Sequence, residues 1–231
     1  MRTAKLLRSR ILAPGVRELT FDPGPDFEFE AGQWISCRIP ATYGEDLARS
    51  YSLASAPRAD GTFDLAVTRV DEGPGSTYLH SLDLGAEVTI SRAQGFFTMD
   101  EFERPAIMIA TGTGISPFRA MLQALDAQGA FPYPVCLLLG VRTEKDILYG
   151  DEFEALARQR NLDFSVTLSQ PSQWSGRRGY VQTHLPELVG RFQGQCDVYI
   201  CGLSKMVKDV RRILKEELGL TKHQIHSERY D

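Results

Sequence analysis

The pattern of apolar residues changes near Pro105, and this change constrains the fold more than any other feature. Before Pro105, short alternating or apolar runs (34–39, 62–67 and 87–90) are separated by turns rich in Gly, Pro and Asp. After it, continuous apolar runs alternate with amphipathic segments of helical length. We therefore expect two domains: an antiparallel barrel or sandwich over 1–100, and a doubly wound parallel α/β sheet over 101–231.

The second half supplies the clearest elements. Strands are predicted at 106–110, 135–139, 164–168 and 198–201. Helices are predicted at 117–128, ended by Gly129, at about 151–160, and at 205–218, ended by Gly219.

Composition excludes several classes of protein. The net charge of -4 over 231 residues argues against a nucleic-acid-binding surface. There is neither an apolar run long enough for a membrane span nor the uninterrupted apolar core of a signal peptide, so we expect a cytoplasmic protein with no membrane partner. The four cysteines have no disulfide or iron-sulfur spacing and are expected to be reduced and mostly buried, and His223 and His226 lack a third ligand, so no metal site is predicted.

Two runs in the first half could hold a flavin. In Arg49-Ser50-Tyr51-Ser52, Arg49 offers a fork for a diphosphate, Tyr51 a flat face for a flavin ring, and Ser52 a hydroxyl for a ring nitrogen. The run 73–79 has glycines that let the backbone approach a ligand and hydroxyls that can cradle phosphate. Taken alone, the first run is more typical of an ordinary surface strand, and the second is as compatible with a hairpin turn before a short helix as with a ligand site.

Two further runs stand where a strand passes into a helix. In 110–119 the glycines leave room for a ligand, and a helix N-terminus with Pro117 in its first turn favours phosphate, although the full Gly-x-Gly-x-x-Gly pattern is absent. In 199–206, Cys201-Gly202 precedes Ser204, a good N-cap. The alternatives are a purely structural turn for the first run and a buried filler role for Cys201.

In this order and spacing, the four runs resemble the ferredoxin-NADP reductase superfamily of FAD-binding FR-type oxidoreductases, over essentially the whole chain. The resemblance implies a flavin-binding Greek-key β-barrel followed by an NAD(P)-binding α/β domain. It also implies bound FAD, with FMN as the weaker alternative, and NADPH or NADH as the substrate.

The resemblance assigns roles to individual residues. Arg49 would bind the flavin diphosphate, Tyr51 would stack on the ring, and Ser52 would bond near N5, the hydride acceptor. Ser52, Cys201 and Glu228 would form the catalytic group. Further flavin contacts would come from Val67, Thr68, Gly75, Ser76 and Thr77.

The dinucleotide contacts follow in the same way. Those near the nicotinamide and diphosphate would be Gly112, Thr113, Gly114, Pro117, Cys201, Gly202 and Met206, and those near the adenosine Arg142, Ser169, Arg178 and Tyr180. NADPH-specific members commonly carry Arg where this chain has Gln170, yet Arg142, Arg177 and Arg178 could supply the charge, so NADH and NADPH stay open. Tyr230, followed here by Asp231, would cover the flavin until nicotinamide displaces it, or would simply pack the chain end.

Three functions are compatible with these features. The first is an NAD(P)H-dependent reductase that passes single electrons to a separate ferredoxin-like or oxygenase partner, because the chain has no iron-sulfur cysteines of its own. The second is a free flavin reductase that releases reduced flavin. The third is a relay subunit of a larger complex without reductase activity of its own.

Overall fold

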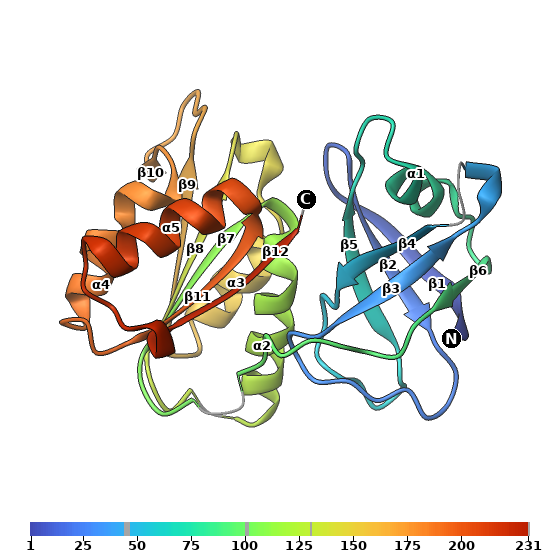
Figure 1. The fold of residues 1–231 in the computed structure, drawn as a ribbon, viewed down its shortest axis with the longest axis horizontal. Coiled ribbons are helices and arrows are strands. Elements are labelled where there is room, and N and C mark those ends of the chain that lie inside the picture. The colour runs from blue at the N-terminus through green and yellow to red at the C-terminus, as the bar shows by residue number, and fades with distance from the viewer. Residues whose placement is uncertain (44–46, 100–101, 130, 231) are drawn as a thin grey trace. The chain divides into compact units, whose positions relative to one another are not determined.

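A computed structural model of the chain describes residues 1–43, 47–99, 102–129 and 131–230 (Figure 1). The chain divides into two compact units. The first unit contains Met1–Met99 together with Ser116–Ala124, and the second contains Asp100–Ile115 together with Leu125–Asp231.

The first unit is built on a six-stranded antiparallel sheet in the order β4-β3-β6-β1-β2-β5. Its strands are β1 (Arg2–Ala13), β2 (Val16–Asp22), β3 (Trp34–Ile39), β4 (Leu47–Ser52), β5 (Phe63–Thr68) and β6 (Glu87–Ile90). Leu53, directly after β4, forms an antiparallel bridge with Leu65 in β5, so the two outer strands of the sheet meet and close it into a barrel.

Apolar residues of alternating positions fill this barrel. Leu19, Ile35 and Leu65 are fully buried in one core cluster, as expected for strands with one face turned inward. Helix α1 (Pro74–Ser81) lies at one end of the barrel (Figure 1), and its Tyr78 and Leu79 join the same core. The helix is thereby fixed beside the strands that carry the predicted flavin residues.

The second unit is a parallel six-stranded sheet in the order β10-β9-β8-β7-β11-β12. Its strands are β7 (Ala106–Thr111), β8 (Val135–Val141), β9 (Leu162–Leu168), β10 (Arg177–Arg178), β11 (Asp197–Leu203) and β12 (Ile225–Tyr230). The order reverses between β7 and β11. In open α/β sheets, ligands bind at the carboxyl ends of the strands at such a switch point.

Helices separate most of these parallel strands. They are α2 (Ile115–Ala127), α3 (Gly150–Ala157), α4 (Leu185–Arg191) and α5 (Ser204–Glu216). Helices α4 and α5 cover one face, where Leu185 and Val207 pack with Ile107 of β7, and α3 lies on the other face (Figure 1). Single turns of 3-10 helix occur at η1 (Ala41–Tyr43), η2 (Gly112–Gly114), η3 (Glu144–Asp146), η4 (Val181–His184) and η5 (Lys222–Gln224).

The predicted fold class is confirmed, with shifts at helix ends. The helices expected at 117–128, 151–160 and 205–218 occupy Ile115–Ala127, Gly150–Ala157 and Ser204–Glu216. The assignment of Ser204 as an N-cap is wrong: β11 continues to Leu203, which takes the cap position, and Ser204 is already helical. The sequence analysis missed α4, β10 and β12.

All four cysteines are free and buried, as predicted. Among the helices of the described residues, none has the length and apolar character needed to cross a membrane.

Candidate functional site

Strand β4 carries the first predicted flavin-binding run, Arg49-Ser50-Tyr51-Ser52. Its antiparallel register with β3 pairs Tyr51 with Ile35 and Ser52 with Trp34. The Tyr51 ring is partly buried against the barrel core, whereas Arg49 is exposed and, within the described ranges, donates to the carbonyl of Ala48 at 3.1 Å. The core therefore orients Tyr51, and the Arg49 guanidinium keeps most of its donors available for a ligand.

Gly75 brings α1 into contact with this strand. A Cβ at position 75 would stand 2.9 Å from Cγ of Arg49 and 2.9 Å from the Tyr51 hydroxyl oxygen, so only glycine allows the approach. Arg49, Tyr51 and the first turn of α1 thus lie together. The first turn of a helix has backbone N–H groups without helical partners, which suits it to bind phosphate.

Ser76 and Thr77, in the first turn of α1, form hydrogen bonds within the protein. The Ser76 hydroxyl accepts a hydrogen bond from the Val70 amide at 3.0 Å and donates to the Gly73 carbonyl at 3.1 Å, so it shapes the turn before α1. Thr77 donates its amide to the Gly73 carbonyl. A phosphate at this place would therefore bind mainly to the amides of Gly75 and Ser76.

The two predicted residues of β5 differ in exposure. The Val67 side chain is buried in the barrel core, and its carbonyl contacts Nε2 of His80 at 2.9 Å. Thr68, the next residue, is exposed at the end of the strand. Of the two side chains, only Thr68 can reach a ligand on the surface.

The surroundings of Tyr51 keep its phenol protonated. Burial raises the pKa of the Tyr51 phenol above its ordinary value, and the nearby Cys37 raises it further. Tyr51 is therefore a neutral ring at physiological pH, as stacking on a flavin would require.

In the second unit, the turn after β7 packs against the end of β11. A Cβ on Gly114 would stand 2.3 Å from the Cys201 carbonyl oxygen, so glycine is needed for the close approach. Cys201 pairs with Ala110 on one side and with Glu228 of β12 on the other. The residues expected around the nicotinamide thus meet at the switch point, in the register of the sheet.

Cys201 is not set up as a nucleophile. Burial raises the pKa of its thiol well above the ordinary value, and the charge of Glu228 adds to the shift. The thiolate is the reactive form of cysteine, so a neutral Cys201 can shape and pack a site but cannot attack a ligand.

Tyr230 of β12 forms hydrogen bonds with the turn that follows β7. Its hydroxyl donates to the Thr111 carbonyl at 2.8 Å and accepts from the Gly114 amide at 2.7 Å, and the Thr113 hydroxyl lies 3.4 Å away. Burial raises the pKa of Tyr230 to about 12. The phenol therefore stays protonated and occupies the hydrogen-bonding groups of the turn.

Two buried hydroxyls near this turn fit a dinucleotide. Thr111 Oγ1 at the end of β7 and Ser204 Oγ in the first turn of α5 are buried and have no hydrogen-bond partner among the described residues. Buried polar groups are rarely left unpaired, so unpaired hydroxyls at the switch point suit a polar ligand. A Cβ on Gly202 would stand 2.2 Å from Thr111 Oγ1 and 2.7 Å from Cε of Met206, and Pro117 stands in the first turn of α2.

The predicted adenosine residues lie at the carboxyl ends of β8, β9 and β10. The Gln170 amide donates to the Arg142 carbonyl at 2.8 Å, which continues the β8–β9 pairing beyond Ser169. Arg178 is exposed and donates to the Trp174 carbonyl at 2.6 Å, and Tyr180 is 70% exposed. Arg142 is exposed as well, so two guanidinium groups flank this edge of the sheet.

Arg177 does not belong with them. It pairs with both carboxylate oxygens of Glu187, and it also lies 3.4 Å from Nδ1 of His184. The possibility that Arg177 supplies charge to the adenosine site is therefore not supported, because a carboxylate already holds its guanidinium.

Sequence reasoning also missed a charged group in the first unit. The run 110–119 ends at Arg119, for which the sequence predicts no charged partner, but its side chain is buried against Asp64 and Glu18. Its place within a strongly apolar helical run was the one signal that could have marked it.

Comparisons with known proteins identify the two domains. Residues 4–99 match the family model described as an oxidoreductase FAD-binding domain, and residues 108–212 match that of an oxidoreductase NAD-binding domain. The chain is 47% identical to ferredoxin--NADP reductase B of Sorangium cellulosum over 99% of this chain and 97% of that one. It is 32% identical to the toluate 1,2-dioxygenase electron transfer component of Pseudomonas putida, over 82% of this chain and 55% of that protein.

Solved structures share the fold. The FAD/NAD-binding domain of the nitric oxide dioxygenase of Vibrio cholerae superposes with a TM-score of 0.88 at 26% identity, covering 99% of this chain and 98% of that one. A ferredoxin NADP+ reductase from Neisseria gonorrhoeae with bound FAD and NADP gives 0.85 at 24% identity, covering 98% and 97%. With its FAD-binding and NAD-binding domains and a near full-length reductase relative, the chain belongs to the ferredoxin-NADP reductase superfamily.

Proposed function

We propose that the protein is an NAD(P)H-dependent flavoprotein reductase that delivers electrons to a separate ferredoxin-like or oxygenase partner. When bound, FAD supplies the chemistry of accepting two electrons as hydride and releasing them singly. The chain's own residues bind the flavin and orient its ring. Arg49 and the first turn of α1 hold the flavin diphosphate, Tyr51 supports the ring, and the Ser52 hydroxyl donates a hydrogen bond near N5.

The second unit has the complementary task. The turn Thr113–Gly114, with Cys201 and Glu228 beside it, receives the nicotinamide, and the neutral Cys201 thiol packs without reacting. The observation that carries the proposal is the meeting of these residues at the switch point of the parallel sheet, in a chain whose 47%-identical relative is a ferredoxin-NADP reductase.

Steady-state electron delivery tests this function. Purified protein with its bound FAD should reduce an added ferredoxin at the expense of NADPH or NADH without added free flavin. A reaction that needs free flavin, with colourless purified protein, would support a free flavin reductase instead. Inactivity alone, restored by a co-purifying metalloprotein, would support a relay subunit.

Replacing Tyr230 by Ser is expected to tighten nicotinamide dinucleotide binding by roughly tenfold, because two competing hydrogen bonds of modest net strength are lost. The Tyr230 hydroxyl bonds to the Thr111 carbonyl and the Gly114 amide, and we propose that the nicotinamide carboxamide bonds to the same two groups. Equilibrium titration with NADP+ and NAD+ measures the change.

Tyr230→Phe is the matched control, because it removes the hydroxyl and leaves the ring. An intermediate gain in affinity would assign the competition partly to the hydrogen bonds and partly to the ring. Unchanged affinity in Tyr230→Ser would reduce Tyr230 to a residue that packs the chain end.

Arg142 and Arg178 are proposed to bind the 2'-phosphate of NADPH. Among the described residues, no carboxylate forms an ion pair with either guanidinium, in contrast to Arg177. Arg142→Ala and Arg178→Ala should each raise the KM for NADPH by about tenfold, as expected for a lost charge-assisted hydrogen bond, and leave that for NADH nearly unchanged. Equal effects on both dinucleotides would place the two residues outside a phosphate site.

We also propose that the domain boundary lies after residue 100 and that the residues named by the family resemblance contact the cofactors, except Arg177 and the buried Val67 side chain. Four free cysteines suit a reducing compartment, and we propose a cytoplasmic location.

A further inference from the structure

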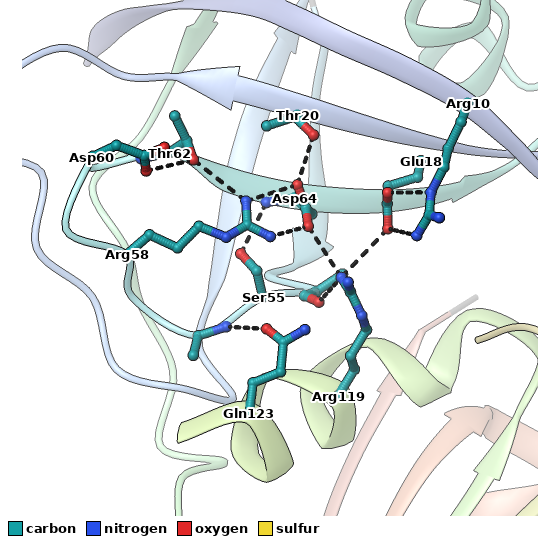
Figure 2. Close-up of polar contacts among 12 residues, drawn as sticks. Arg10, Glu18, Thr20, Ser55, Arg58, Asp60, Thr62, Asp64, Arg119 and Gln123 are labelled. Atoms are coloured by element: carbon teal, nitrogen blue, oxygen red, sulfur yellow. Dashed lines mark hydrogen bonds and ion pairs between the residues drawn. The ribbon is translucent and has the colours of Figure 1, made fainter. Parts of the chain in front are cut away.

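Helix α2 sends a buried arginine into the polar part of the first unit. The Arg119 side chain is only 7% exposed, and its Nη1 donates to the Ala54 carbonyl at 2.7 Å and to Asp64 Oδ2 at 3.0 Å (Figure 2). The same nitrogen lies 3.4 Å from Glu18 Oε2. One guanidinium therefore connects a loop carbonyl with two carboxylates on neighbouring strands.

Asp64 is the centre of this cluster. Its side chain is 3% exposed and accepts hydrogen bonds from Thr20 at 2.7 Å and from Arg58 through both carboxylate oxygens (Figure 2). Glu18 in turn receives Nε of Arg10 at 2.6 Å. Each buried carboxylate thus has more than one cationic or hydroxyl donor, as buried charges require.

The loop that Arg119 holds directly continues β4, the strand that carries Tyr51 and Ser52. Ala54 follows Ser52 by two residues, and its own amide donates to the Asp64 carbonyl at 2.8 Å. Between them, the Leu53 amide donates to the Gln33 carbonyl at 2.9 Å. The backbone just after Ser52 is therefore fixed on both sides, by β5 and by the segment before β3.

A second side chain of α2 acts on the same loop. Gln123 stands one helical turn after Arg119, so both project from the same side of the helix. Its Oε1 accepts a hydrogen bond from the Ala56 amide at 3.1 Å (Figure 2). Ser55, between the two held residues, accepts the Asp64 amide at 3.0 Å. Three consecutive residues, 54–56, are thus hydrogen-bonded to α2 or to β5.

Buried ion pairs add little net stability, because the cost of desolvating the charges offsets much of their attraction, and apolar side chains of similar size would stabilise the fold as well. What a guanidinium adds is directional hydrogen bonding, since its N–H donors lie in one plane. We propose that Arg119 and Gln123 are positioning residues for hydride transfer, which hold the loop 54–56 and thereby place Ser52 and Tyr51 against the flavin. This inference rests on the proposed reductase function.

The test separates positioning from folding. Arg119→Lys keeps the charge beside Asp64 but loses the planar guanidinium, and Gln123→Leu removes the hydrogen bond from the Ala56 amide. Asp126→Asn is the control: Asp126 also lies on α2, and the change breaks its ion pair with Arg160, which follows α3, without touching the loop. Each holoenzyme is mixed anaerobically with saturating NADPH, or NADH if the wild type prefers it, and with the same dinucleotide deuterated at C4.

We expect the limiting rate of flavin reduction to fall by about tenfold or more in Arg119→Lys and by less in Gln123→Leu, since an ångström of misplacement can cost a hundredfold. FAD content and dinucleotide affinity should stay within twofold of wild type, and the deuterium isotope effect should stay expressed. The control should react like wild type.

Unchanged limiting rates in both variants would overturn the proposal, and so would rate losses that follow loss of FAD. If Arg119→Lys does not fold, the result for Gln123→Leu decides. Failure of the wild type itself to reduce its flavin is a different result, because it would contradict the reductase function and not the placement of the loop.

Discussion

Replacing Ser52 by alanine is expected to slow reduction of bound FAD by about a hundredfold, the effect of losing one preorganised hydrogen bond to a reacting centre. Ser52 ends β4, opposite Trp34, two residues before Ala54, the start of the loop that Arg119 and Gln123 hold. Its hydroxyl is therefore on a fixed backbone. Stopped-flow absorbance under anaerobic conditions measures the rate, and the visible spectrum measures how much FAD remains bound.

Ser50→Ala is the matched control for this experiment. Ser50 lies on the same strand, is exposed, and its hydroxyl is 3.4 Å from that of Ser36. The control should leave the rate of flavin reduction unchanged. A normal rate in Ser52→Ala would exclude its hydroxyl from the mechanism, whereas equal losses in both variants would indicate a general effect on the strand.

The second large effect concerns stability. Asp64→Asn is expected to lower the free energy of unfolding of the first unit by about 3 kcal/mol, because removing one partner of a buried ion pair leaves the other charge uncompensated. Arg119 is nearly as buried as Asp64, and both it and Arg58 would face a neutral amide. Asp83→Asn removes the same charge from an exposed position and serves as the control.

The same residue sets a dependence on pH. Burial alone would raise the pKa of Asp64, but hydrogen bonds from Arg58, Thr20 and Arg119 outweigh it and hold the pKa below the ordinary 3.8. A carboxyl with a lowered pKa contributes stability that is fully present above its unfolded pKa and is lost as the pH falls through the folded value. Wild-type stability should therefore fall below about pH 4, and the Asp64→Asn variant should lose less over that range.

Urea unfolding followed by tryptophan fluorescence can isolate the first unit. The chain has two tryptophans, Trp34 in the first unit and Trp174 in the second, so a Trp174→Phe background reports on Trp34 alone. An unfolding free energy unchanged by Asp64→Asn, or an equal loss of stability in acid with and without Asp64, would contradict the account of the buried cluster.

Much of the fold follows from local sequence pattern. Buried parallel strands such as β7 and β8 are covered on both faces and are therefore apolar throughout, which makes them visible without an alignment. β12 escaped prediction because Ile225–Tyr230 is an edge strand with a polar sequence, and only its pairing with β11 makes it a strand. The contact between Tyr230 and the turn at Gly114 depends on that pairing.

The buried cluster shows a second limit. Alternation along β5 would turn Asp64 and Ala66 toward solvent, yet both are buried, as is Thr62 directly before the strand. The segment 116–124 of α2 belongs to the same unit and brings Arg119 to Asp64. A contact between residues more than fifty positions apart leaves no periodic signal in the sequence.

The motif residues were predictable for a different reason. Gly75 and Gly114 each allow a close backbone approach that a Cβ would block, and such requirements fix residue type and spacing. A motif does not show the protonation state of its side chains, such as the neutral thiol of Cys201.

Anaerobic mixing of the purified protein with NADPH and, separately, with NADH tests the central claim most directly. The account predicts that the flavin absorbance bleaches with at least one of the two dinucleotides and returns when an electron acceptor is added. A flavin that remains oxidised with both, in protein that retains FAD, would contradict it.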